Sequence, residues 1–218
     1  MIDLRALLVT ARKDGWASGL GEIDDVRNAA DALDWEEIRI RRSGPPVSTL
    51  RPVETSEANP RSLSAVYGKG LQPLHTDGAH LSKPPDLVIL MSEDINSTPT
   101  LLWKNPTLRE TRIGTPFEAL HHGMFLVQNG RDSFYAPTVE GQNCRYDPGC
   151  MTPCDSRALK VVNYFEEAQS EATAFDWSSE KKILIIDNRR TLHARSQVAE
   201  GDDGRELTRI AYRTGGDA

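Results

Sequence analysis

The sequence predicts a mainly β, α+β fold: a β-sandwich or jelly roll with flanking helices. Many short segments have the length and apolar pattern of strands, few segments have helical periodicity, and residues 43–62 form a proline-containing loop. The chain has 218 residues and contains no repeat or linker long enough to separate two domains. We therefore expect one domain over residues 1–218.

Four segments have the character of helices. Residues 3–12 place their leucines on one side, and Asp24 or Asp25 could cap a second helix that ends near Leu33. Residues 115–122 would form a third helix, with Pro116 at its first position. Residues 155–170 give the strongest pattern, with an aspartate at the start and an apolar face that includes Leu159, Val162 and Phe165.

The strands are indicated by alternation or by continuous apolar runs. They are expected at residues 37–41, 86–91, 100–103, 181–187 and 205–213. Residues 124–135 read as a hairpin around Asn129-Gly130, because this dipeptide tolerates the positive φ angles of a type I′ turn.

Composition excludes several classes of protein. The net charge of −6 argues against a nucleic-acid partner, whose phosphates require a basic face. No segment approaches the roughly 20 apolar residues that cross a bilayer. Asp3 and Arg5 interrupt the apolar run that a signal peptide needs, so we expect a cytoplasmic protein without a membrane partner.

Cys144, Cys150 and Cys154 lie close together, and a structural zinc site is one reading of them. An odd count without a second pair or a nearby histidine favours free thiols instead.

Leu74-His75-Thr76-Asp77-Gly78 places an imidazole and a carboxylate two residues apart. In an extended strand these two side chains point to the same side. His193, which follows the apolar run 183–186, could supply a second imidazole. Two histidines and one carboxylate leave adjacent coordination positions open, which suits iron(II) that must bind an oxo-acid and O2. A His-x-Asp triplet is common by chance, and His80 and the pair His121-His122 are other candidates.

The chain at this point resembles the taurine dioxygenase and clavaminate synthase-like family of iron(II)/2-oxoglutarate oxygenases. Two separated blocks carry the resemblance: residues 74–78 with 84–90 and Thr100, and residues 187–195 with 205–209. The resemblance implies a distorted double-stranded β-helix, Fe(II) held by His75, Asp77 and His193, 2-oxoglutarate as cosubstrate, O2, and a small-molecule substrate. The oligomeric state is left open.

The resemblance also implies a 2-oxoglutarate site. The family places an arginine ten to fifteen residues after the second histidine, and Arg205 is twelve residues after His193. Thr100 matches a threonine that assists cosubstrate binding, although Asn96-Ser97-Thr98-Pro99 replaces the usual Gly-Gly pair and makes Thr98 a competitor.

Two further arginines are candidates for contact with the substrate. Arg209 shares a face with Arg205 if residues 205–213 are extended, and a buried guanidinium requires an anion. That anion is either a group of the substrate or an acidic side chain of the protein. Arg145, in Arg145-Tyr146-Asp147, resembles a family segment near the active site, but an ion pair between strand and turn explains it equally well.

Asp77 favours hydroxylation, desaturation or ring closure, because relatives that halogenate replace this carboxylate with a small residue. The short, arginine-rich chain is similar to orthoester-forming oxygenases of oligosaccharide and aminoglycoside antibiotic pathways, and a cationic aminoglycoside suits the negative charge. Amino-acid or peptide hydroxylation is the alternative. From other classes, a non-catalytic metal-binding jelly roll and a zinc hydrolase with the same triad also remain.

Overall fold

The computed structural model describes residues 2–41, 44–105, 116–130 and 132–215. Its helices are α1 (Leu4–Asp14), α2 (Ile23–Asp31), α3 (Ser64–Tyr67), α4 (Phe117–His122) and α5 (Ser156–Ala168), followed by a 3₁₀ turn at Gln169–Glu171. In the described residues no helix is long and apolar enough to span a membrane.

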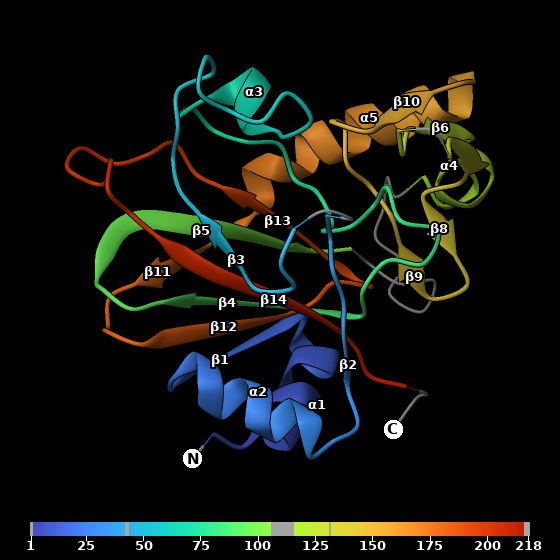
Figure 1. Cartoon of the computed structure of the whole chain (residues 1–218). Helices are drawn as coiled ribbons and strands as arrows, with labels where there is room; N and C mark the ends of the chain where they lie inside the picture. Colours follow the sequence, from blue (N-terminus) through green and yellow to red (C-terminus); the bar gives the residue numbers. More distant parts are fainter. Residues whose placement is uncertain (1, 42–43, 106–115, 131, 216–218) are drawn as a thin grey trace.

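Two antiparallel sheets form the frame of the molecule (Figure 1). The main sheet has the order β1-β12-β4-β14-β2, with β3 also paired to β14. Its strands are β1 (Trp16–Leu20), β2 (Glu36–Glu37), β3 (Ser48–Leu50), β4 (Leu87–Ser92), β12 (Lys182–Asp187) and β14 (Leu207–Arg213). The second sheet has the order β11-β5-β13 and consists of β5 (Asn96–Lys104), β11 (Thr173–Trp177) and β13 (Thr191–Arg195).

Two smaller antiparallel units lie beyond the second sheet, beside α4 and α5 (Figure 1). One has the order β10-β6-β7 and the other pairs β8 with β9. Their strands are β6 (Phe125–Val127), β7 (Phe134–Ala136), β8 (Val139–Glu140), β9 (Asn143–Cys144) and β10 (Met151–Pro153).

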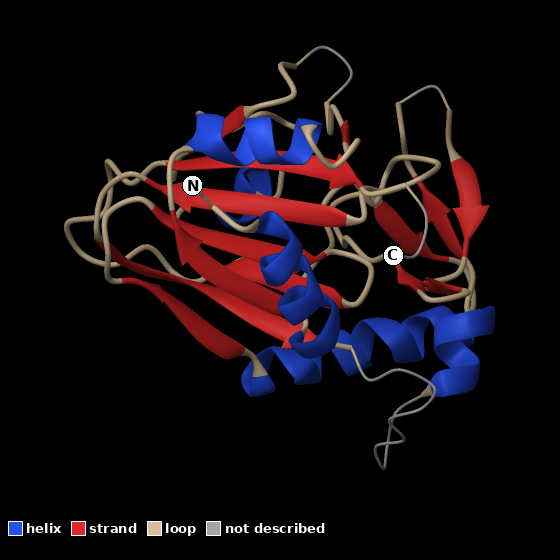
Figure 2. Ribbon diagram, turned by 90° about the horizontal axis from the view of Figure 1, so that it is seen from below, coloured by secondary structure: helices blue, strands red, loops and turns tan. Residues whose placement is uncertain are grey.

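The central strands of the main sheet are buried on both faces. On the inner face, Val88, Leu90, Leu184 and Ile186 meet Leu102 and Trp177 of the second sheet. On the outer face, Leu87, Ile89, Ile183 and Ile185 pack under α1 and α2, which lie across the strands in the view from below (Figure 2). Because successive side chains of a strand point to opposite faces, burial on both faces accounts for the continuous apolar runs in the sequence.

The outer face of the second sheet is covered by α5. Trp103 meets Phe165 edge-on, with 5.9 Å between the ring centroids. The sequence pattern predicts this helix and its Asp155 cap, whose carboxylate accepts from Ala158 N–H at 2.7 Å. The predicted apolar face is right at Phe165, which is buried, and wrong at Leu159, which is 55% exposed, while Val162 is partly buried. The other buried side chains are Ala158, Val161 and Ala168, and the small alanines let the helix approach the sheet.

The sequence locates most elements, with differences at their ends. The helix at α2 starts at Ile23 without a side-chain cap, so Asp24 and Asp25 lie in its first turn rather than before it. The strand expected at residues 37–41 is reduced to β2, since only Glu36 and Glu37 pair with β14. The predicted start at Thr115 of the helix at α4 lies outside the described residues.

The predicted hairpin at residues 124–135 forms, but without its expected turn. Val127 pairs with Phe134, so the connection spans residues 128–133 rather than two residues. Gly130 has a positive φ of 62° but Asn129 does not, and a type I′ turn requires both.

Candidate metal centre

Two backbone hydrogen bonds hold His75 against His193. The His75 N–H donates to the His193 carbonyl at 2.9 Å, and the His193 N–H donates to the His75 carbonyl at 2.8 Å. His193 belongs to β13, whereas His75 forms only this isolated antiparallel bridge. The sequence pattern predicted an extended strand through both His75 and Asp77. This strand does not form, because the chain enters a turn at Asp77.

Gly78 makes that turn possible. Its φ is +69°, in the left-handed region that side chains disfavour. A Cβ atom here would also lie 2.8 Å from Cδ of Pro85, so only glycine fits between the metal-site turn and the start of β4.

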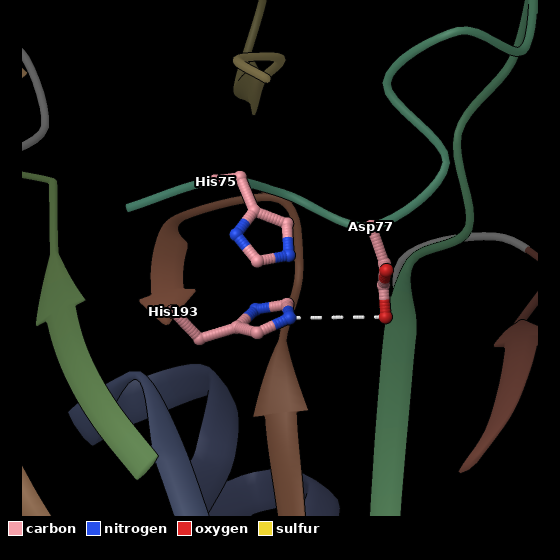
Figure 3. A group of neighbouring side chains, drawn as sticks. All are labelled: His75, Asp77 and His193. Carbon is pink, nitrogen blue, oxygen red and sulfur yellow. Dashed lines mark ion pairs between the residues drawn. The ribbon is translucent and has the colours of Figure 1, made fainter. Parts of the chain in front are cut away.

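His75, Asp77 and His193 each offer one ligand atom, and these atoms lie within 4.8 Å of one another. The three side chains converge on one point (Figure 3), with 3.7 Å between His193 Nε2 and Asp77 Oδ2. Asp77 Oδ2 is buried and has no hydrogen-bond partner among the described residues. An unpartnered buried carboxylate oxygen is costly, so a cation at this position fits the donor set.

The protonation states also suit a metal. Burial, and then the neighbouring His75, lower the pKa of His193 from 6.5 to about 3, so its imidazole is neutral and can act as a ligand at neutral pH. Burial alone would raise the pKa of Asp77, but Arg209 and the neighbouring imidazoles hold it below its ordinary value. The carboxylate therefore stays charged.

A contact to the backbone orients one imidazole. His75 Nδ1 lies 3.0 Å from the Pro73 carbonyl, to which a protonated Nδ1 donates. This tautomer leaves the lone pair of Nε2 directed away from the backbone and available to a metal.

Arg209 meets the same carboxylate. Its Nη1 donates to Asp77 Oδ1 at 2.7 Å, and its Nε donates to Ser48 Oγ at 3.3 Å. Of the two partners that the sequence left open for Arg209, the structure shows an acidic side chain of the protein. That side chain is the candidate metal ligand itself, and Arg209 leaves Asp77 Oδ2 for the cation.

Arg205 lies in a different environment, in the loop before β14. It is only 8% exposed, its Nε donates to Asn96 Oδ1 at 2.8 Å, and its Nη2 is buried without a partner among the described residues. Burial, and then the nearby Arg195, lower the pKa of Arg205 to about 10, which still leaves it charged at neutral pH. A buried guanidinium with an unpaired nitrogen fits a carboxylate ligand.

Thr98 and Thr100 are both buried on the same side of β5. The Thr98 hydroxyl donates to Asp202 Oδ2 at 2.6 Å and accepts from Ala199 N–H at 3.0 Å, so it holds the loop before Arg205. The Thr100 hydroxyl accepts from Trp177 Nε1 at 3.1 Å and keeps its own proton to donate.

Arg145 is engaged with the segment that follows Asp77. Its guanidinium donates to the carbonyls of Ala79 and Leu81, and to that of Ser82 at 2.9 Å. Its predicted role in binding substrate stays a prediction, and the contacts show that Arg145 fixes the loop beside the triad.

The other candidates lie elsewhere. His80 Nε2 contacts the Ile40 carbonyl at 2.9 Å, and His121 and His122 are on α4. The three cysteines are unpaired, and Cys144 is buried next to Asn105. Asn188 has no separate role in the sequence pattern, but its side chain lies against the backbone of Asp77.

No family model matches the sequence, and no curated protein matches it either. Solved structures do match in three dimensions. An asparagine oxygenase, in complex with Fe(II), 3-hydroxyasparagine and succinate, has a TM-score of 0.75 at 17% identity, over 97% of this chain and 79% of that one. The non-haem iron oxygenase OrfP, with Fe, succinate and (3S)-hydroxy-L-arginine, has a TM-score of 0.71 at 16% identity, over 97% and 80%.

The chain has the fold of non-haem iron oxygenases. PvcB from Pseudomonas aeruginosa, an iron- and α-ketoglutarate-dependent oxygenase of an isonitrile synthetic pathway, also matches, with a TM-score of 0.66 at 17% identity over 97% of this chain and 80% of that one. At these identities the likeness concerns the fold, and the site must be interpreted from its own residues.

Proposed function

We propose that this protein is an iron(II)/2-oxoglutarate-dependent oxygenase with a frame of the double-stranded β-helix type. The observation that carries the proposal is the buried triad of His75, Asp77 and His193, in which one oxygen of Asp77 has no partner among the described residues. The neutral imidazole of His193 and the charged carboxylate of Asp77 are ligand forms that suit iron(II).

Arg205 would hold the distal carboxylate of 2-oxoglutarate. Its buried, unpaired Nη2 supports this role, whereas the Arg209 guanidinium already has the Asp77 carboxylate as an anionic partner at its Nη1. Thr100 would donate its hydroxyl proton to the same carboxylate, while Thr98 is engaged with Asp202.

The overall reaction would consume substrate, 2-oxoglutarate and O2, and yield oxidised substrate, succinate and CO2. The bound iron would supply the activation of O2, and the protein would supply orientation and exclusion of water. Asp77 and His193 are buried and His75 is partly buried, so two of the three ligands are shielded from solvent by the protein.

For the substrate, we favour an α-amino acid or a small peptide. Arg209 contacts Asp77 through Nη1 and Ser48 through Nε, and its Nη2 has no hydrogen bond to the described residues. A substrate carboxylate could pair with that nitrogen beside the metal. The asparagine oxygenase and OrfP, which share the fold, were solved with hydroxylated amino acids.

An aminoglycoside or oligosaccharide substrate, including orthoester formation, is the second candidate. The net charge of −6 favours a cationic substrate. Nothing in the geometry of the site adds to this, so it ranks below an amino acid.

Anaerobic addition of iron(II) and then 2-oxoglutarate tests the oxygenase proposal. An oxygenase should develop the weak visible charge-transfer band of iron-chelated 2-oxoglutarate, and Asp77→Ala should not. A zinc hydrolase or a non-catalytic metal-binding jelly roll would bind metal without that band. Absence of the band in the iron-loaded wild-type protein would therefore reject the proposal.

A further inference from the structure

Asn188 lies in the turn that joins β12 to β13, five residues before His193. Its side chain is 1% exposed and reaches across to the opposite segment of the metal site. The Asp77 N–H donates to Asn188 Oδ1 at 2.9 Å, and Asn188 Nδ2 donates to the Asp77 carbonyl at 3.0 Å. One side-chain amide therefore satisfies both backbone groups of the candidate carboxylate ligand.

The same amide also ties Asp77 to the start of β4. Asn188 Nδ2 donates to the Pro85 carbonyl at 2.9 Å, and the Asn188 main-chain N–H donates to the Asp86 carbonyl at 3.0 Å. Asn188 thus links three segments: the turn with Asp77, the entry to β4, and the turn that leads to His193.

The chemistry of these contacts requires an amide. Two carbonyls need N–H donors and one N–H needs an acceptor, and the asparagine side chain is short and carries both. An aspartate could accept from the Asp77 N–H, but it would place a negative charge against two carbonyl oxygens. An aliphatic residue would leave all three buried backbone groups without these partners.

We propose that Asn188 is a positioning residue for the metal centre: it fixes the backbone of Asp77 so that Oδ2 faces the two imidazoles. The inference rests on the proposed function for the identity of the metal. Arg209 fixes the other oxygen of the carboxylate, so the ligand is held at its backbone by Asn188 and at its side chain by Arg209. Residues that orient a ligand in this way commonly affect metal affinity about 10- to 100-fold when they are replaced.

The test measures binding of Co(II) alone to the metal-free full-length protein, followed by its visible ligand-field spectrum. Asn188→Asp should weaken Co(II) binding by about 10- to 100-fold and change the shape of the spectrum. The matched control is Asn105→Asp, which also replaces a buried amide. In the described structure the Asn105 side chain contacts Cys144 and not the triad. The control should keep wild-type affinity and spectrum.

A merely structural role would lower thermal stability without metal and leave Co(II) affinity and spectrum unchanged, and that result overturns the inference. If Asn188→Asp does not fold by near-ultraviolet circular dichroism, Asn188→Ser replaces it in the same measurement. If neither variant folds, Asn188 is a folding residue and the inference is rejected.

The outcomes also separate this inference from the proposed function. Wild-type protein that does not bind Co(II) would overturn both. Wild-type protein that binds Co(II), beside an Asn188→Asp variant with equal affinity, would overturn only the positioning role.

Discussion

Arg205 and Arg209 are four residues apart, yet their guanidinium groups have different partners. Arg209 is neutralised by Asp77 at 2.7 Å, whereas Arg205 donates to the neutral amide of Asn96 and has a buried nitrogen without a partner in the described part of the chain. The family resemblance predicts Arg205 as the arginine that binds 2-oxoglutarate, because of its spacing from His193. The structure adds a physical reason: Arg205 needs an anion, and Arg209 already has one.

This difference predicts that substitutions of the two arginines weaken the binding of different ligands. Arg205→Ala should weaken 2-oxoglutarate binding by about 1.5–3 kcal/mol, or about 10- to 150-fold, because a charged hydrogen-bond partner is lost. The measurement is a 2-oxoglutarate titration of the anaerobic iron(II) protein, followed at the charge-transfer band. Arg209→Ala serves as the comparison and should weaken iron binding instead, since it removes the donor that holds Asp77 Oδ1 and orients the carboxylate. If Arg209→Ala rather than Arg205→Ala raises the 2-oxoglutarate dissociation constant, the cosubstrate arginine has been misassigned.

At the scale of elements, the metal site depends on a turn packed against a strand. The turn at Asp77 approaches the start of β4 at Pro85, and Gly78 stands between them with a left-handed backbone. Asn188 closes the same contact from the turn before β13. The ligands are therefore placed by the junction of three segments rather than by one strand that carries both His75 and Asp77.

The close approach at Gly78 predicts a large effect of adding one methyl group. Gly78→Ala should lower the free energy of unfolding by about 2–5 kcal/mol, from the left-handed φ together with the overlap with Pro85. Gly141→Ala is the matched control, because Gly141 has a similar φ of +61° but open space around it, and it should cost only about 1–2 kcal/mol. Urea denaturation of the metal-free proteins measures both. Equal losses in the two variants would show that the contact with Pro85 does not constrain the turn.

The predictions that came from the sequence succeeded where a pattern is local. The apolar runs of β4 and β12 and the Asp155 cap of α5 are such patterns. The buried face of α5 was predicted correctly at Phe165 but wrongly at Leu159, which is apolar and exposed, because alanines fill the close contact with the sheet.

The candidate site was also predictable in part: the sequence predicted the three ligands but not the contacts that hold them. His75, Asp77 and His193 lie together as expected, and the family motif supplied His193. The Arg209–Asp77 ion pair and the Asn188 contacts join residues more than 100 positions apart, so no local pattern could reveal them.

At the scale of the whole molecule, the candidate metal site lies where a loop segment meets the second sheet, and the helices cover the outer faces of the two sheets. Helices α1 and α2 cover the main sheet, α5 covers the second sheet, and the three ligands lie where the segment 75–77 meets β13. The main sheet contributes Arg209 from β14, so a substrate beside the iron would meet residues of both sheets. The net charge of −6 belongs to the molecule as a whole, whereas the triad itself is contacted by the cation Arg209.

The net charge of the protein is negative, but the side chain that contacts the triad is the cation Arg209. This contrast predicts a substrate that carries a carboxylate. A substrate screen under identical iron and oxygen conditions would measure succinate formed above the uncoupled background, with amino acids, small peptides, aminoglycosides, pseudo-oligosaccharides and small sulfonates compared. We expect an amino acid or peptide to give coupled turnover, because its carboxylate can pair with Arg209 beside the metal. The same substrate with its carboxylate converted to an amide is the control and should lose coupling. Coupled turnover with an aminoglycoside alone would instead favour the role of the negative surface, and its binding should then weaken as salt concentration rises.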